Sequence, residues 1–251
     1  MVCKNFKPIL ISLFVIFATS CAGKNPEDVK QAGLSYDVGV MLLNRGNYPG
    51  AIQQLTSAQR LNPDDPYTAN ALGLAYYGVG MKPEAERSYK KAIGLKKDYS
   101  DAYSNLGVLY LSESKWDLAI DAFHSALSNP LYMSPQITWA NMGWAYYQMD
   151  KLDQAERAYR SALELLPDMP LAHNDLGLVY LRENRLNEAE TEFKTAIYYF
   201  KGYTQAYLNL GIVYMRRKNY TEAKKQFETV LTMAPNSPIA ADARNYIRLL
   251  R

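Results

Sequence analysis

Residues 170–203 read PLAHNDLGLVYLRENRLNEAETEFKTAIYYFKGY. Gly177 lies in the first half of this stretch, and Ala189 and Ala196 follow it by twelve and nineteen residues. Small residues allow the backbones of two packed helices to approach closely. The stretch therefore predicts two helices in contact, with the glycine on the first helix and both alanines on the second.

The same pattern recurs along most of the 251-residue chain. The equivalent glycines are 34, 34, 36, 34 and 34 residues apart, and they are Gly39, Gly73, Gly107, Gly143, Gly177 and Gly211. A helix-turn-helix unit of 34 residues is the period of the tetratricopeptide repeat, and such units bury their apolar faces by stacking on one another. We therefore predict an all-α superhelical solenoid of six tetratricopeptide repeats over residues 32–237.

Residues 238–251 follow the last repeat and have apolar side chains at helical spacing, including Ile239, Ala243, Tyr246 and Ile247. The end of a repeat array would otherwise expose the apolar face that the next repeat covers. This segment is therefore predicted to be a C-terminal capping helix.

The first 20 residues have the order of a secretory signal peptide, with Lys4 and Lys7 before an apolar run at residues 9–17. The small residues directly before Cys21 resemble a bacterial lipobox, although Ala18 stands where leucine is preferred. The resemblance implies lipidation of Cys21, and Ala22 after it favours sorting to the outer membrane. The alternative is an ordinary secretory signal that leaves Cys21 as a free thiol.

Residues 21–31 are then a lipidated N-terminus with a short spacer, which would hold the repeats in the periplasm close to the membrane. Asn25 and Pro26 have the order of a helix N-cap and a first-turn proline, so a helix is expected to begin there.

Composition argues against several other functions. Without Lys4 and Lys7 the chain has 26 basic and 25 acidic residues, a balance that gives no reason to expect a nucleic-acid partner. Cys3 and Cys21 are the two cysteines, and His124 and His173 have no ligand-like neighbours at metal-binding spacing. We therefore expect no metal, no cofactor, no small-molecule substrate and no catalytic residues, and hence a protein that is not an enzyme.

The first helix of each repeat lines the inner surface of a tetratricopeptide superhelix, so its residues on that side form the candidate partner-binding groove. Most of them are apolar, and an apolar stripe in water suggests a bound peptide or amphipathic helix. Trp144 and Tyr147 are the candidates for the strongest contacts. The alternative is that some of these side chains are buried within the array itself. The candidate residues are Tyr36, Leu43, Asn70, Leu74, Tyr77, Val108, Leu111, Trp144, Tyr147, Asn174, Leu178, Leu181, Ile212 and Met215.

A lipobox followed directly by six repeats resembles the pilotin family of type IV pilus biogenesis and stability lipoproteins. Between repeats three and four, Leu131, Tyr132 and Pro135 are similar to a Leu-Tyr-x-x-Pro link of that family. The resemblance implies an outer-membrane scaffold that binds secretin subunits and supports their targeting and assembly. An adaptor that docks peptidoglycan hydrolases or another envelope or secretion complex would need the same anchor and groove, so it stays as the alternative.

Overall fold

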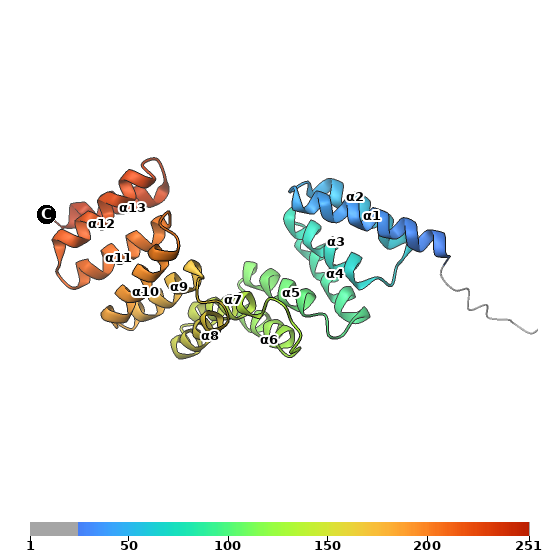
Figure 1. The fold of residues 1–251 in the computed structure, drawn as a ribbon, viewed down its shortest axis with the longest axis horizontal. Helices are drawn as coiled ribbons and strands as arrows, with labels where there is room; N and C mark the ends of the chain where they lie inside the picture. The colour runs from blue at the N-terminus through green and yellow to red at the C-terminus, as the bar shows by residue number, and fades with distance from the viewer. Residues whose placement is uncertain (1–24, 251) are drawn as a thin grey trace, which may run out of the picture.

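The computed structural model describes residues 25–250, which form thirteen α-helices and no strand. The helices follow one another in antiparallel pairs and curve into an arch, with α1 and α13 at its two ends (Figure 1). The prediction of an all-α tetratricopeptide solenoid is confirmed. The helices are α1 (Pro26–Asn44), α2 (Tyr48–Leu61), α3 (Pro66–Gly78), α4 (Lys82–Leu95), α5 (Ser100–Ser112), α6 (Trp116–Leu127), α7 (Pro135–Gln148), α8 (Leu152–Leu165), α9 (Pro170–Arg182), α10 (Leu186–Tyr199), α11 (Thr204–Arg216), α12 (Tyr220–Met233) and α13 (Pro238–Leu249).

The odd-numbered helices form the inner layer of the arch. From α1 to α11, each odd-numbered helix contacts its partner helix and also the next odd-numbered helix, whereas the even-numbered helices contact only their sequence neighbours. The layer whose members lie closer together has the smaller radius. The concave surface is therefore built from α1, α3, α5, α7, α9 and α11.

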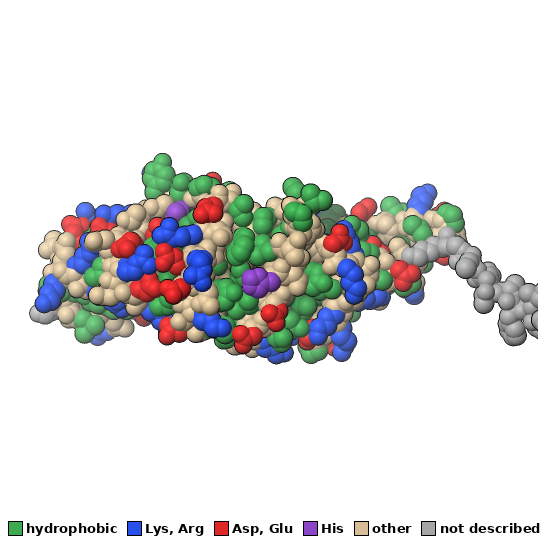
Figure 2. All heavy atoms as spheres, turned by 90° about the horizontal axis from the view of Figure 1, so that it is seen from below, with side chains coloured by type: hydrophobic (Ala, Val, Ile, Leu, Met, Phe, Trp, Pro, Cys, Tyr) green, Lys and Arg blue, Asp and Glu red, His purple; other side chains and the backbone are tan. Residues whose placement is uncertain are grey.

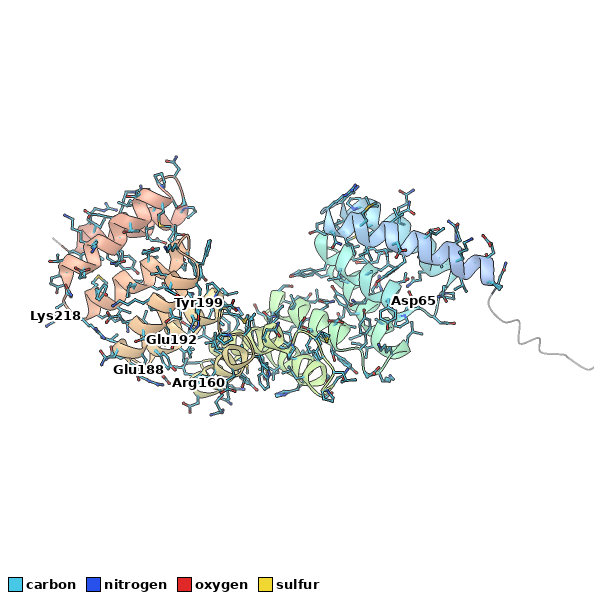
Figure 3. The ribbon with its side chains drawn as sticks, in the orientation of Figure 1. Asp65, Arg160, Glu188, Glu192, Tyr199 and Lys218 are labelled. Carbon is cyan, nitrogen blue, oxygen red and sulfur yellow. The ribbon has the colours of Figure 1, made fainter. Side chains whose placement is uncertain are left out.

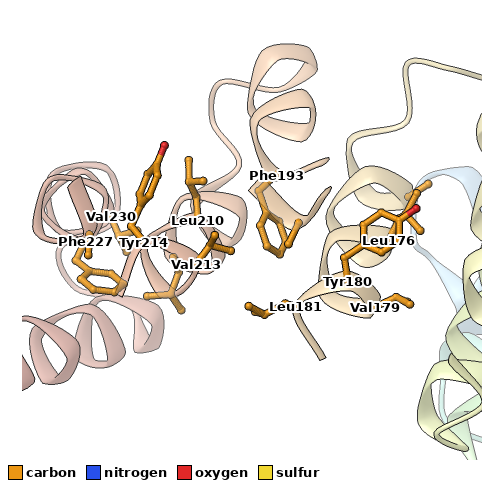
Figure 4. Packing of buried hydrophobic residues seen from close by; sticks show 14 of the residues in the cluster. Leu176, Val179, Tyr180, Leu181, Phe193, Leu210, Val213, Tyr214, Phe227 and Val230 are labelled. Carbon is orange, nitrogen blue, oxygen red and sulfur yellow. The ribbon is translucent and has the colours of Figure 1, made fainter. Parts of the chain in front are cut away.

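The repeat glycines allow each pair of helices to close. A methyl group placed on Gly143 or Gly177 would lie less than 3 Å from the ring of Tyr159 or Phe193. Figure 4 shows Phe193 between the buried side chains of α9 and those of α11. These contacts confirm the predicted role of the glycines, because a larger residue would push the aromatic ring away.

The turn inside each repeat also recurs. One residue per turn has a positive φ, at Gly46, Gly80, Ser114, Asp150, Asn184 and Lys218. A left-handed conformation costs about 1–2 kcal/mol for a residue with a Cβ atom. The sequence places glycine at only two of these six turns.

Three tyrosine–glutamate hydrogen bonds join an inner helix to the outer helix of the preceding repeat. Tyr110, Tyr180 and Tyr214 each donate to a glutamate 24 residues earlier, over 2.9–3.0 Å. Around the middle bond, Glu156 also accepts from Arg185 and Arg160. Figure 3 places Arg160 on the outer side of the arch, and Figure 2 shows acidic and basic side chains interspersed over the outer face of the C-terminal half.

The segment between α6 and α7 accounts for the two-residue slip in the repeat spacing. Asn129 binds the carbonyl of Asp98 through its amide nitrogen and the Leu131 N–H through its amide oxygen. The Tyr132 hydroxyl lies 3.1 Å from the Thr138 hydroxyl. These bonds fix the link and leave Leu131 and Met133 more than four-fifths exposed.

The two ends of the array are formed by α1 and α13. Asn25 accepts a hydrogen bond from the Glu27 N–H, so α1 begins at Pro26, inside the predicted spacer. At the other end α13 packs on α12, and the Tyr246 ring stacks on Phe227 with centroids 5.1 Å apart. The predicted signal peptide and Cys21 lie outside the described residues. Within residues 25–250, no helix combines the length and the apolar character that a membrane span requires.

Candidate partner-binding groove

The predicted groove residues divide by exposure. Leu74 and Trp144 are exposed, each at 37%. Asn70, Asn174 and Leu181 are buried, so the structure places them inside the inner layer and leaves little of them for a partner to contact. The others are partly exposed: Tyr36, Leu43, Tyr77, Val108, Leu111, Tyr147, Leu178, Ile212 and Met215.

The N-terminal part of the groove contains an aromatic pocket of about 370 Å³ between α1 and α3. Five predicted residues line it: Tyr36, Leu43, Asn70, Leu74 and Tyr77. The pocket also contains Tyr48 and Tyr67, which the prediction did not include. Tyrosines combine a large apolar surface with a hydrogen-bonding hydroxyl, which is a common composition for a peptide-binding surface.

The middle of the groove carries a stack of three side chains. The Trp144 and Tyr147 rings on α7 are stacked with centroids 5.7 Å apart. The guanidinium of Arg182 on α9 lies 5.1 Å from the Tyr147 ring. Arg182 is held by an ion pair with Asp150 at 3.2 Å and by a hydrogen bond to the Tyr147 carbonyl. The two residues predicted to make the strongest contacts therefore lie together on a fixed surface.

Asparagine bridges connect neighbouring inner helices below this surface. Asn105 donates to Asn70 over 3.1 Å, and Asn209 donates to Asn174 over 2.9 Å. In both bridges the partners are 35 residues apart. Ala140 on α7 and Asp175 on α9 have the same spacing, but the alanine side chain has no hydrogen-bonding group and cannot form a bridge.

A pocket of about 310 Å³ lies at this position, lined by Ala140, Asn141, Trp144, Leu171 and Asp175. Burial raises the pKa of Asp175 to about 6, partly opposed by a hydrogen bond from the Asn174 amide. The sequence prediction missed this aspartate because it considered only positions that face the groove. Pairing residues 35 apart across the repeats would have identified it.

His173 lies on α9 outside the groove and is held by other side chains. Its Nδ1 is 2.6 Å from Glu192, its Nε2 is 2.9 Å from the Pro167 carbonyl, and its ring stacks on Tyr199. Glu192 and Tyr199 can be located in Figure 3. Among residues 25–250 no group of three histidine, cysteine, aspartate or glutamate side chains is placed to hold a metal ion.

Comparison with known proteins supports the repeat assignment. Residues 53–199, more than half of the chain, match the family described as "Cilia and flagella-associated protein 70 C-terminal domain", and residues 204–237 match the tetratricopeptide repeat. The human protein O-mannosyl-transferase TMTC1 is 27% identical over 139 residues. That alignment covers 54% of this chain but only 16% of the human protein.

Two solved structures are similar over most of their length. Pseudomonas aeruginosa PilF aligns with a TM-score of 0.78 and 17% identity, covering 88% of this chain and 99% of PilF. PilW, described as a widely conserved type IV pilus biogenesis factor, aligns with a TM-score of 0.78 and 18% identity, covering 84% and 97%. At these identities the likeness establishes the fold. Membership of the pilotin family in particular is not established by it.

Proposed function

We propose that this chain, which belongs to the family of the cilia and flagella-associated protein 70 C-terminal domain, is a binding scaffold of the bacterial outer membrane. In this proposal Cys21 carries the lipid anchor, and the concave groove binds secretin subunits. The scaffold supports their targeting to the outer membrane and their assembly for type IV pilus biogenesis.

The observation that carries the proposal is the groove itself. Its N-terminal pocket contains four tyrosines, and its centre presents Trp144 beside Tyr147. Exposed aromatic side chains in a preformed groove lose little conformational entropy when they bind a protein segment. A surface of this kind favours a protein partner over a small molecule.

The direction towards pilus biogenesis comes from two independent features. PilF and PilW match nearly their whole length to this chain, so the likeness extends beyond a few shared repeats. The lipobox-like sequence before Cys21 would place the array at a membrane, where secretin assembly takes place. Two or more acyl chains on one residue are sufficient for stable anchoring.

The test is affinity purification of the tagged full-length protein from detergent-solubilised envelopes, with mass spectrometry of the bound proteins. The groove variant carries Trp144→Ala and Tyr147→Ala. The control carries Tyr220→Ala, which removes a half-exposed tyrosine from the start of α12, outside the predicted groove set. Circular dichroism of each variant checks that the helices remain formed.

We expect a secretin to co-purify with the unmodified protein and with the Tyr220 variant, and to be lost from the groove variant. Peptidoglycan hydrolases without a secretin would reject the secretin assignment in favour of the adaptor hypothesis. A secretin retained by the groove variant would preserve the function but reject the groove as its binding site.

A further inference from the structure

We propose that the pocket between Ala140 and Asp175 binds a lysine or arginine side chain of the segment that occupies the groove. This inference rests on the proposed function, since it assumes that a protein segment binds on the concave surface. It adds the chemical nature of one contact, which the proposed function leaves unspecified.

The pocket lies at a junction without the asparagine bridge that two other junctions have. Between α3 and α5 and between α9 and α11, an asparagine side chain fills the space beside the residue 35 positions later. Ala140 ends at its Cβ atom, so the corresponding space next to Asp175 stays open. An asparagine at position 140 would extend a side chain into this space.

Asp175 lines this pocket and has few partners for its carboxyl group. Its side-chain partner is the Asn174 amide at 3.0 Å, and within residues 25–250 no lysine, arginine or histidine forms an ion pair with it. Burial raises the pKa of Asp175 to about 6, so the group is ionised at neutral pH. An ionised carboxylate can accept several hydrogen bonds, and here most of that capacity is unused by the described residues.

The neighbouring polar groups do not neutralise the charge. Tyr159, buried on α8, has a hydroxyl without a hydrogen-bond partner among the described residues. Burial raises the pKa of Tyr159, and the negative charge of Asp175 raises it further. The same two causes raise the pKa of Tyr203 to about 12. A cationic ligand would relieve this unfavourable electrostatic environment, and an anionic ligand would worsen it.

The walls suit the rest of a basic side chain. Trp144 on α7 and Leu171 on α9 are both exposed and line the pocket. Lysine and arginine bury their aliphatic stems against apolar surface and extend their charged ends to polar groups. A guanidinium or ammonium group near the Trp144 ring would gain a further cation–π attraction.

The test uses a library of random dodecapeptides displayed on phage, selected on the full-length protein in detergent. Peptides are selected on the wild-type protein and on three variants. Asp175→Asn removes the charge and keeps the shape, whereas Ala140→Asn keeps the charge and fills the pocket with the side chain found at Asn70 and Asn174. Asp121→Asn on α6 is the control, because it removes an exposed carboxylate from the outer layer.

We expect the wild-type pool to share a lysine or arginine at a fixed position, and the derived synthetic peptide to lose at least tenfold in affinity for the Asp175 and Ala140 variants. Affinity for the Asp121 variant should not change. A pool without a fixed basic position, including one with no enrichment, would overturn the inference, as would equal binding to Asp175→Asn. The envelope purification is independent of these results, so the inference can fail while the proposed function survives.

Discussion

Replacement of Asp175 by asparagine should stabilise the protein at pH 8 and leave its stability unchanged at pH 4. Burial raises the pKa of this carboxyl from its ordinary 3.8 to about 6. The folded state therefore binds the proton more tightly than the unfolded state does. The protonated carboxyl therefore contributes to stability at low pH, and this contribution is lost as the pH rises from about 4 through 6.

The magnitude follows from the interval between those two values. At about 1.4 kcal/mol per pKa unit, ionising the buried group costs the folded state at most about 3 kcal/mol. Asp175 is only partly buried by surface area, so solvent reduces this cost, and about 1–2 kcal/mol is the expected gain at pH 8. Asparagine has no charge at either pH, and the equivalent positions in α5 and α11 already hold Asn105 and Asn209.

The assay is urea unfolding of the full-length protein in detergent at pH values between 4 and 8, with circular dichroism as the measure of helix content. The measured quantity is the difference in unfolding free energy between Asp175→Asn and the unmodified chain at each pH, with Asp121→Asn as a control for loss of a carboxylate. A difference that stays constant between pH 4 and 8 would refute the reasoning. A loss of stability at pH 8 would also refute it, because it would mean that the carboxylate is compensated in the folded state.

Three further predictions test other parts of the repeat framework. Lys218→Gly should raise the free energy of unfolding by about 1 kcal/mol in urea titrations, since Lys218 has a positive φ and an exposed side chain, and Asn184→Gly should gain less because asparagine tolerates this conformation better. Gly177→Ala should lower the melting temperature through a collision with Phe193 worth about 1–3 kcal/mol, whereas Gly94→Ala, with open space around it, should not lower it. Burial lowers the pKa of His173, but the hydrogen bonds to Glu192 and the Pro167 carbonyl outweigh burial and raise the pKa overall. The protonated imidazole therefore stabilises the fold at pH 6, and this contribution is lost as the pH rises through the raised pKa. We expect His173→Gln to lower the free energy of unfolding more at pH 6 than at pH 9 in the same titrations.

The sequence predicted the architecture well because the repeat is set by local packing rules. Gly143 must accommodate Tyr159, and Gly177 must accommodate Phe193, so the 34-residue spacing of small and aromatic residues determines which helices pair. The capping helix was predictable for the same reason, since the apolar face around Phe227 needs a cover and Tyr246 supplies it. The start of α1 was predictable from its cap, Asn25.

The groove was less predictable because exposure depends on contacts between repeats. Leu181 occupies the same place in its repeat as Tyr147, yet Leu181 is buried while Tyr147 is partly exposed. Asn70 and Asn174 were predicted to face a partner, but hydrogen bonds to the next inner helix take up their side chains. A pattern within one repeat cannot reveal such contacts, which require comparison of residues 35 positions apart.

Stability and binding make opposite demands at the junction of α7 and α9. An asparagine at position 140 or at position 175 would reproduce features found elsewhere in the array: the first could donate a hydrogen bond to the Asp175 carboxylate, and the second would remove its charge. Polar groups that weaken a fold without local compensation occur preferentially at functional sites. If Asp175→Asn both stabilises the protein and loses the basic peptide, the carboxylate is maintained for its ligand. If the same substitution stabilises the protein and leaves peptide selection unchanged, the charge has no role in binding, and the groove must recognise its partner through the Trp144 and Tyr147 surface and the N-terminal tyrosines.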